Sequence, residues 1–118
     1  LNSRDFIFIE DICFGLVQCG LAGNPGESYN LASGKETSIL DLAKLINKIT
    51  DNPAPPEIKP VRDWDRSGKR FGSTEKSKNE IGFEAKTSIE EGLKITIEWT
   101  QNNKELIESN INKHSQKI

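Results

Sequence analysis

Two clusters of proline and glycine divide this sequence into short segments, and no long helix or strand is expected to cross them. The first cluster contains Gly20, Gly23, Pro25 and Gly26, and the second, residues 51–56, contains three prolines. Proline cannot continue a helical hydrogen-bond ladder, and glycine weakens helices and strands alike. We therefore predict the order strand, helix, strand, helix, strand, helix, helix, which indicates a small α/β or α+β unit.

The predicted helices are marked by their first residues and by apolar stripes. Glu10 and Asp11 favour the start of a first helix, because carboxylates interact well with the positive end of the helix dipole. Thr37 or Ser38 precedes a second helix, and the prolines of residues 51–56 end it. The apolar stripe of this second helix contains Ile39, Leu42, Ile46 and Ile49.

The second half of the sequence predicts two more helices. A short helix over residues 74–80 ends at Gly82 as a left-handed cap, with Phe83 folding back onto its last turn. Ser88 and Glu91 have the spacing of a capping box at the start of the last helix. The chain turns polar after that helix, so we assign residues 1–101 to one domain and residues 102–118 to a helical extension or a disordered tail.

Three short strands are predicted between these helices. Phenylalanine and isoleucine alternate over residues 6–9, which indicates a strand with two apolar faces. Residues 28–32 and 57–61 are the other two β-prone runs. Residues 62–72 are strongly charged and are predicted to form a loop.

Composition and charge exclude several classes of function. The 16 basic and 18 acidic side chains give a net charge of −2, which creates no global field to attract nucleic acid or anionic lipid. No apolar run approaches the ~20 residues that a membrane span needs, and the N-terminus has no signal-peptide core. Cys13 and Cys19 lie too far apart on the predicted helix to form a disulfide. We therefore expect reduced, mostly buried cysteines in a cytoplasmic protein.

Three segments, in order, carry a resemblance to a known family. They are Arg4-Asp5-Phe6-Ile7-Phe8-Ile9-Glu10-Asp11; Gly26-Glu27-Ser28-Tyr29-Asn30-Leu31-Ala32-Ser33-Gly34 followed by Thr37-Ser38-Ile39; and Ile81-Gly82-Phe83 followed by Ser88-Ile89-Glu90-Glu91-Gly92-Leu93 and Thr96-Ile97-Glu98-Trp99. These segments resemble the closing third of NAD-dependent nucleotide-sugar epimerases and dehydratases, the extended short-chain dehydrogenase/reductases. The resemblance implies a substrate-binding C-terminal domain whose partner is an N-terminal Rossmann domain that holds NAD.

The same resemblance implies a substrate site for a nucleotide-diphosphate sugar. Arg62 matches the family arginine that binds the diphosphate, Asp65 the carboxylate that binds the ribose, and Arg4 a second arginine that reaches the diphosphate. Guanidinium donors match phosphate oxygens two at a time, and a carboxylate accepts from both hydroxyls of a ribose diol. The sequence departs from the family at Trp64, where glycine is usual. The plain alternative is surface ion pairing, which for Arg4 means a salt bridge to Asp5 or Glu10.

The groups that the family uses for catalysis are not found in this sequence. Its Tyr-x-x-x-Lys pair has no match, because Ser33 stands four residues after Tyr29, the single tyrosine. We expect Tyr29 to be a core residue and His114 to be inert. No catalytic or cofactor-binding residue is assigned, and one histidine with two separated cysteines provides no metal site.

These observations predict a C-terminal fragment that binds the nucleotide half of the substrate and is inactive alone. A chain that starts at Leu1 and contains no methionine supports a truncated piece. The alternative is a freestanding, non-catalytic interaction module with the same fold, whereas an RNA-binding domain fits the net charge poorly. The sequence of residues 63–70 inclines us toward a dehydratase of amino-sugar pathways, with epimerisation left open. We also expect an exposed apolar surface on the first strand and first helix, which would favour a homo-oligomer.

Overall fold

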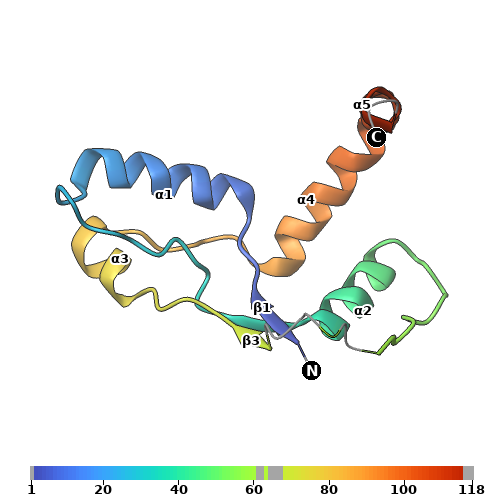
Figure 1. The fold of residues 1–118 in the computed structure, drawn as a ribbon, viewed down its shortest axis with the longest axis horizontal. Helices are drawn as coiled ribbons and strands as arrows, with labels where there is room; N and C mark the ends of the chain where they lie inside the picture. Colours follow the sequence, from blue (N-terminus) through green and yellow to red (C-terminus); the bar gives the residue numbers. More distant parts are fainter. Residues whose placement is uncertain (1, 61–62, 64–67, 116–118) are drawn as a thin grey trace.

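A computed structural model describes residues 2–60, 63 and 68–115 and confirms a small α/β unit of five helices and a three-stranded sheet (Figure 1). The described residues extend over 45 × 33 × 32 Å. In chain order the elements are β1 (Ser3–Asp5), α1 (Ile9–Ala22), β2 (Glu36–Ser38), α2 (Ile39–Ile49), β3 (Lys69–Arg70), α3 (Glu75–Ile81), α4 (Ile89–Asn102) and α5 (Lys104–Ser115).

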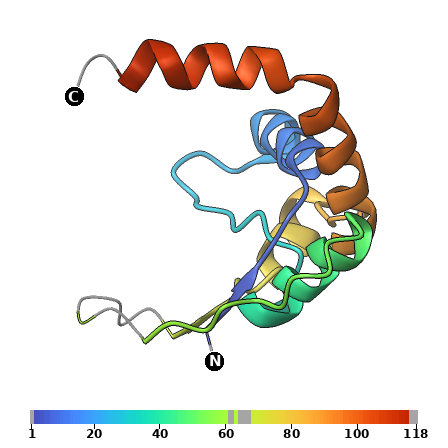
Figure 2. The same cartoon turned by 90° about the vertical axis from the view of Figure 1, so that its right-hand side faces the viewer.

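The sheet joins three segments that are far apart in the sequence, in the order β2-β1-β3. β1 pairs antiparallel with β2, where Arg4 lies opposite Thr37, and parallel with β3, where Arg4 lies opposite Arg70. Figure 1 shows α1 and α3 on one side of this narrow sheet and α2 with α4 on the other. Figure 2 shows α5 turning away from the end of α4 and projecting from the rest of the chain.

The buried core of the described residues is small and centres on the end of α3. Phe83 is completely buried and Ile81 is 4% exposed. Gly82 adopts a positive φ of 65°, which glycine tolerates without steric cost, and Phe83 N–H donates to the Ser77 carbonyl at 3.1 Å. The predicted left-handed cap and the returning phenylalanine are therefore confirmed.

Two predicted helix starts are confirmed by their caps. The Ser38 hydroxyl accepts a hydrogen bond from Asp41 N–H at 3.0 Å at the start of α2. The Ser88 hydroxyl accepts from Glu91 N–H at 3.2 Å at the start of α4. Each serine satisfies one of the backbone donors that a helix leaves open in its first turn.

The three predicted strands are wrong in position. β1 lies before residues 6–9, and residues 28–32 belong to no ladder. Residues 57–60 form no strand, and residue 61 lies outside the described residues. The strands that do form, β2 and β3, are short and polar. A strand exists only where a second backbone completes its hydrogen bonds, and the β-prone runs find no such partner within the described residues.

The outer side of α1 is apolar and exposed, which confirms the expected exposed surface for this helix. Its large apolar side chains that are exposed are Ile9, Phe14, Leu16, Val17 and Leu21. Cys13 is exposed and Cys19 half-buried, both as free thiols, so the prediction of mostly buried cysteines is wrong for Cys13. No helix within the described residues is long and apolar enough to cross a membrane.

The inner side of α1 approaches the core through Gly15. A methyl group at this buried position would lie 2.8 Å from both the Leu31 side chain and the Phe83 ring, well inside normal contact. Gly20 lies on the same helix with nothing within 4 Å of the equivalent point. These two glycines therefore differ in packing while sharing the same helical backbone.

We predict that alanine is tolerated better at Gly20 than at Gly15. Gly20→Ala should raise the free energy of unfolding by up to ~1 kcal/mol, because alanine favours the helix. Gly15→Ala should be ~1–3 kcal/mol less stable than Gly20→Ala, because its methyl group overpacks the contact with Phe83. Urea denaturation followed by circular dichroism measures both variants. Equal stabilisation by the two substitutions would contradict the close approach at Gly15.

Candidate functional site

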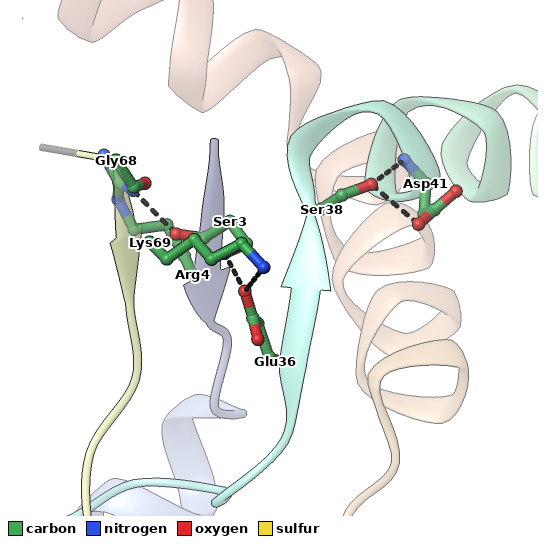
Figure 3. A network of polar contacts seen from close by, with 7 residues as sticks. All are labelled: Ser3, Arg4, Glu36, Ser38, Asp41, Gly68 and Lys69. Atoms are coloured by element: carbon green, nitrogen blue, oxygen red, sulfur yellow. Dashed lines mark hydrogen bonds and ion pairs between the residues drawn. The ribbon is translucent and has the colours of Figure 1, made fainter. Parts of the chain in front are cut away.

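Arg4 lies on the central strand of the sheet, beside Gly68, the residue before β3. Its Nη1 donates to the Ser3 carbonyl at 2.6 Å and to the Gly68 carbonyl at 2.7 Å (Figure 3). Ser3 N–H also donates to the Gly68 carbonyl, at 3.4 Å. The register of β1 with β3 thus places this guanidinium against the residue that immediately precedes β3.

The Glu36 carboxylate links the three strands next to Arg4. It accepts from the hydroxyl of Ser3, which is 3% exposed, and lies 3.7 Å from the ammonium group of Lys69 (Figure 3). The sheet residues carry three cations (Arg4, Lys69, Arg70) and two carboxylates (Asp5, Glu36), a net charge of +1. This end of the molecule is therefore slightly cationic in a chain that is acidic as a whole.

Asp5 has a structural role that the sequence analysis missed. Its carboxylate accepts from Ser33 N–H at 2.9 Å, from Gly34 N–H at 2.8 Å and from the Ser33 hydroxyl. Gly34 has a positive φ of 73° at this turn. Asp5 therefore binds the turn before β2, in place of the salt bridge with Arg4 that we considered. The sequence carried one sign of this role, namely an Arg-Asp pair followed by a Ser-Gly turn before the next helix.

The predicted substrate-binding set is only partly described. Arg4 lies in β1, while Arg62 and Asp65 lie outside the described residues. The grouping of all three residues therefore stays a prediction. Lys69 and Arg70 are two further cations of the charged segment at residues 62–72, and they lie in β3 on exposed positions beside Arg4.

The larger hollows in the described structure are apolar and do not include Arg4. One of about 350 Å³ lies where residues 6–9 meet α2 and α4, with Leu42, Ile46 and Leu93 in its wall. A second, of about 330 Å³, is lined by Phe8, Ile9, Ile95 and Trp99 among others. These walls offer few polar partners for a nucleotide, so we do not assign substrate to them.

The glycines after α1 do not fit a dinucleotide cofactor. Gly20, Gly23 and Gly26 have the Gly-x-x-Gly-x-x-Gly spacing. A dinucleotide turn follows a strand and opens a helix, so that the pyrophosphate meets the helix N-terminus. Here the glycines close α1 at its C-terminal end and lead into an extended segment. The described residues therefore supply no recognisable NAD site.

The resolved changes in pKa belong to surface ion pairs outside the sheet. A hydrogen bond from Lys76 holds the pKa of the Glu27 carboxyl below its ordinary value, and raises the pKa of Lys76 in return. Lys94 lowers the pKa of Glu90 in the same way. Neither pair resembles an acid–base couple in a cleft, so neither is a catalytic candidate.

Comparison with known proteins identifies relatives of two activities. A UDP-glucose 4-epimerase from Mycolicibacterium smegmatis is 28% identical over 101 residues, which cover 86% of this chain and 32% of the relative. The human dTDP-D-glucose 4,6-dehydratase is 30% identical over 108 residues, which cover 87% of this chain and 31% of the relative. This chain thus spans about a third of the length of these curated relatives. No protein-family profile matches it.

Solved structures give the same result. The Bordetella bronchiseptica enzyme WbmF, crystallised with NAD⁺ and UDP, is 53% identical with a TM-score of 0.84, over 98% of this chain and 35% of that one. The epimerase Mth375 from Methanothermobacter thermautotrophicus is 38% identical with a TM-score of 0.86, over 92% of this chain and 32% of that one. The sheet and helices described above are therefore shared with enzymes of known structure.

We predict that Asp5→Asn destabilises the fold. The substitution removes a charged acceptor shared by three donors, so the free energy of unfolding should fall by ~1–3 kcal/mol. Asp51→Asn is the matched control, because Asp51 is exposed and has a positive φ of 52° that asparagine also tolerates. Urea denaturation compares the two variants. A loss no greater for Asp5→Asn than for Asp51→Asn would show that the turn does not depend on this carboxylate.

Proposed function

Because this chain belongs to the extended short-chain dehydrogenase/reductases and matches the C-terminal portion of their NAD-dependent epimerases and dehydratases, we propose that it binds the nucleotide-diphosphate part of a nucleotide sugar. It would act as the substrate-binding portion of an epimerase or 4,6-dehydratase. The relative WbmF was crystallised with UDP and NAD⁺, which supports this class of ligand and cofactor for the complete enzyme.

One observation carries the proposal: Arg4 lies on the central strand with its guanidinium against Gly68, which follows Arg62 and Asp65 closely in the sequence. A sheet holds a side chain more rigidly than a loop does, so Arg4 is well placed to fix one end of a diphosphate. A planar guanidinium can present two parallel donors to phosphate oxygens. We propose that Arg4 and Arg62 share the diphosphate and that Asp65 accepts from the ribose hydroxyls.

The chemistry of the proposed enzyme would lie in residues other than these. NAD supplies hydride acceptance at a sugar carbon when it is bound, and the described residues show no site for it. The role of this chain would be to hold the nucleotide so that the sugar extends toward the cofactor. Such anchoring of a non-reacting group lowers the entropic cost of reaching the productive geometry. We propose that the chain alone is not catalytic.

We predict that Arg4→Gln weakens nucleotide binding. Loss of a charge-assisted contact of ~1.5 kcal/mol should reduce the affinity for UDP about tenfold. Isothermal titration with UDP, GDP and dTDP measures the effect, with Arg62→Gln and Asp65→Asn in parallel. Lys104→Gln, which removes one positive charge from the exposed start of α5, is the control and should bind like the unaltered chain.

A structural role for Arg4 predicts a different pattern. If Arg4 only ties the Gly68 carbonyl to the sheet, Arg4→Gln should lower the free energy of unfolding and leave the affinity of the folded chain for UDP unchanged. Denaturation of the same variants separates the two cases. Binding of no nucleotide by the unaltered chain, or equal affinity for all four variants, would contradict the proposal.

A further inference from the structure

The side chains of the sheet are sorted by charge between its two faces. Successive residues of a strand point to opposite faces, and residues that lie opposite each other in paired strands share a face. The register therefore places on one face the side chains of Ser3, Asp5, Glu36, Ser38 and Lys69. Figure 3 shows the Glu36 carboxylate joining Ser3 and Lys69 on this face. Both carboxylates of the sheet thus lie on the same side as Lys69.

The opposite face of the sheet carries Arg4, Thr37 and Arg70, which we call the arginine face. Arg4 lies directly opposite Thr37 in β2 and directly opposite Arg70 in β3. Among the sheet residues, no carboxylate shares this face with the two guanidinium groups. Like charges directly opposite each other destabilise a sheet, so this arrangement does not favour the fold.

Arg70 makes no contact that would give it a structural role. It is exposed, and its guanidinium forms no hydrogen bond or ion pair with any of the described residues. Its neighbour Lys69, in contrast, lies 3.7 Å from the Glu36 carboxylate on the other face. An exposed cation that is set beside a second cation and has no acidic neighbour is suited to an anionic ligand.

The arginine face continues into a small hollow that also contains no acidic group. The hollow has a volume of about 170 Å³ and shares Thr37 with the arginine face. Its other polar lining residues are Ser33, Lys35, Lys86, Thr87 and Ser88. None of the described residues that line it is acidic. Hydroxyl and ammonium groups both donate to phosphate oxygens, so donors for an anion extend beyond the two arginines.

We propose that Arg70 is a further diphosphate-binding residue, and that the arginine face holds the diphosphate between the guanidiniums of Arg70 and Arg4. The inference rests on the proposed function, because the diphosphate is that of the nucleotide sugar proposed above. Each phosphate of a diphosphate is charged, so the ligand can meet two guanidiniums at once, whereas a nucleoside monophosphate meets one. Arg70 therefore selects a diphosphate over a monophosphate.

The pairing of β3 with β1 supplies the information that identifies Arg70. In the sequence, Arg70 is one of several cations in the charged segment at residues 62–72, and nothing separates it from Lys69. The parallel register places Arg70 opposite Arg4 and turns Lys69 to the face that contains Glu36. Two adjacent cations of one strand thereby acquire different roles.

Calorimetric titration of the chain with UDP and with UMP tests the proposal. Arg70→Gln should weaken UDP binding about tenfold, the loss expected for one charge-assisted contact, and should change UMP binding much less. Lys69→Gln is the matched control, because it removes the same charge from the same strand on the opposite face. This control should bind UDP like the unaltered chain. Equal losses for the two variants, or no loss for either, would overturn the proposal.

Urea denaturation without ligand separates binding from a structural role. Arg70→Gln removes one of two neighbouring like charges, so its free energy of unfolding should equal or exceed that of the unaltered chain. A residue that stabilises the sheet would show the opposite change. A lower free energy of unfolding for Arg70→Gln would therefore assign Arg70 to the fold and contradict the proposal.

Inorganic pyrophosphate distinguishes a failure of this inference from a failure of the proposed function. If UDP binds and Arg70→Gln does not weaken it, the role of Arg70 is refuted and the nucleotide proposal stands. If UDP does not bind but pyrophosphate binds and is weakened by Arg70→Gln, the arginine face stands and the nucleotide proposal is refuted. Binding of neither ligand refutes both.

Discussion

The structure depends on the backbone pairing of β1 with two strands that lie far from it in the sequence. Three residues, Ser3–Asp5, bind the turn before β2 and Gly68, the residue before β3. Closing the long loops between these strands costs entropy. Side-chain contacts to β1 stabilise the two strand pairings in addition to the backbone hydrogen bonds. The Glu36 carboxylate accepts a hydrogen bond from the Ser3 hydroxyl and forms an ion pair with Lys69. The Asp5 carboxylate accepts a hydrogen bond from Gly34 N–H. These polar contacts near the candidate site therefore stabilise the sheet.

The small core explains why so much apolar surface remains on α1. Within the described residues, Phe83 and Ile81 are the buried hydrophobic side chains, while five apolar residues of α1 are exposed. A chain of this length can bury enough surface to fold, but the margin is narrow. The inner side of α1 approaches Leu31 and Phe83 at Gly15, so this helix has one covered side and one exposed side.

The sequence predicted the helices better than the strands, and the reason is physical. Helices α2 and α4 can be recognised from nearby residues alone. Ser38 and Ser88 cap their first turns, and the apolar side chains of each helix recur at helical spacing. A strand cannot satisfy its backbone hydrogen bonds within its own segment, because its partner is another strand. Residues 6–9 and 57–60, although β-prone, form no ladder within the described residues, whereas polar Lys69 and Arg70 do. Pairing geometry, set by distant residues, overrode β-propensity.

For the candidate site, the motif alone selected Arg4, and the tertiary structure decided what surrounds it. The Arg-Asp pair indicated a functional segment, but no spacing rule shows that Gly68 lies against the guanidinium or that Asp5 binds the turn at Gly34. Helix starts, the left-handed Gly82 cap and the family were determined by the sequence itself, because each depends on residues adjacent in the chain. Strand identity and the exposure of Cys13 were decided by contacts between distant segments. Such contacts form only when the free energy gained by burial exceeds the entropic cost of closing the loop between the segments. The order of residues in the sequence does not reveal that difference.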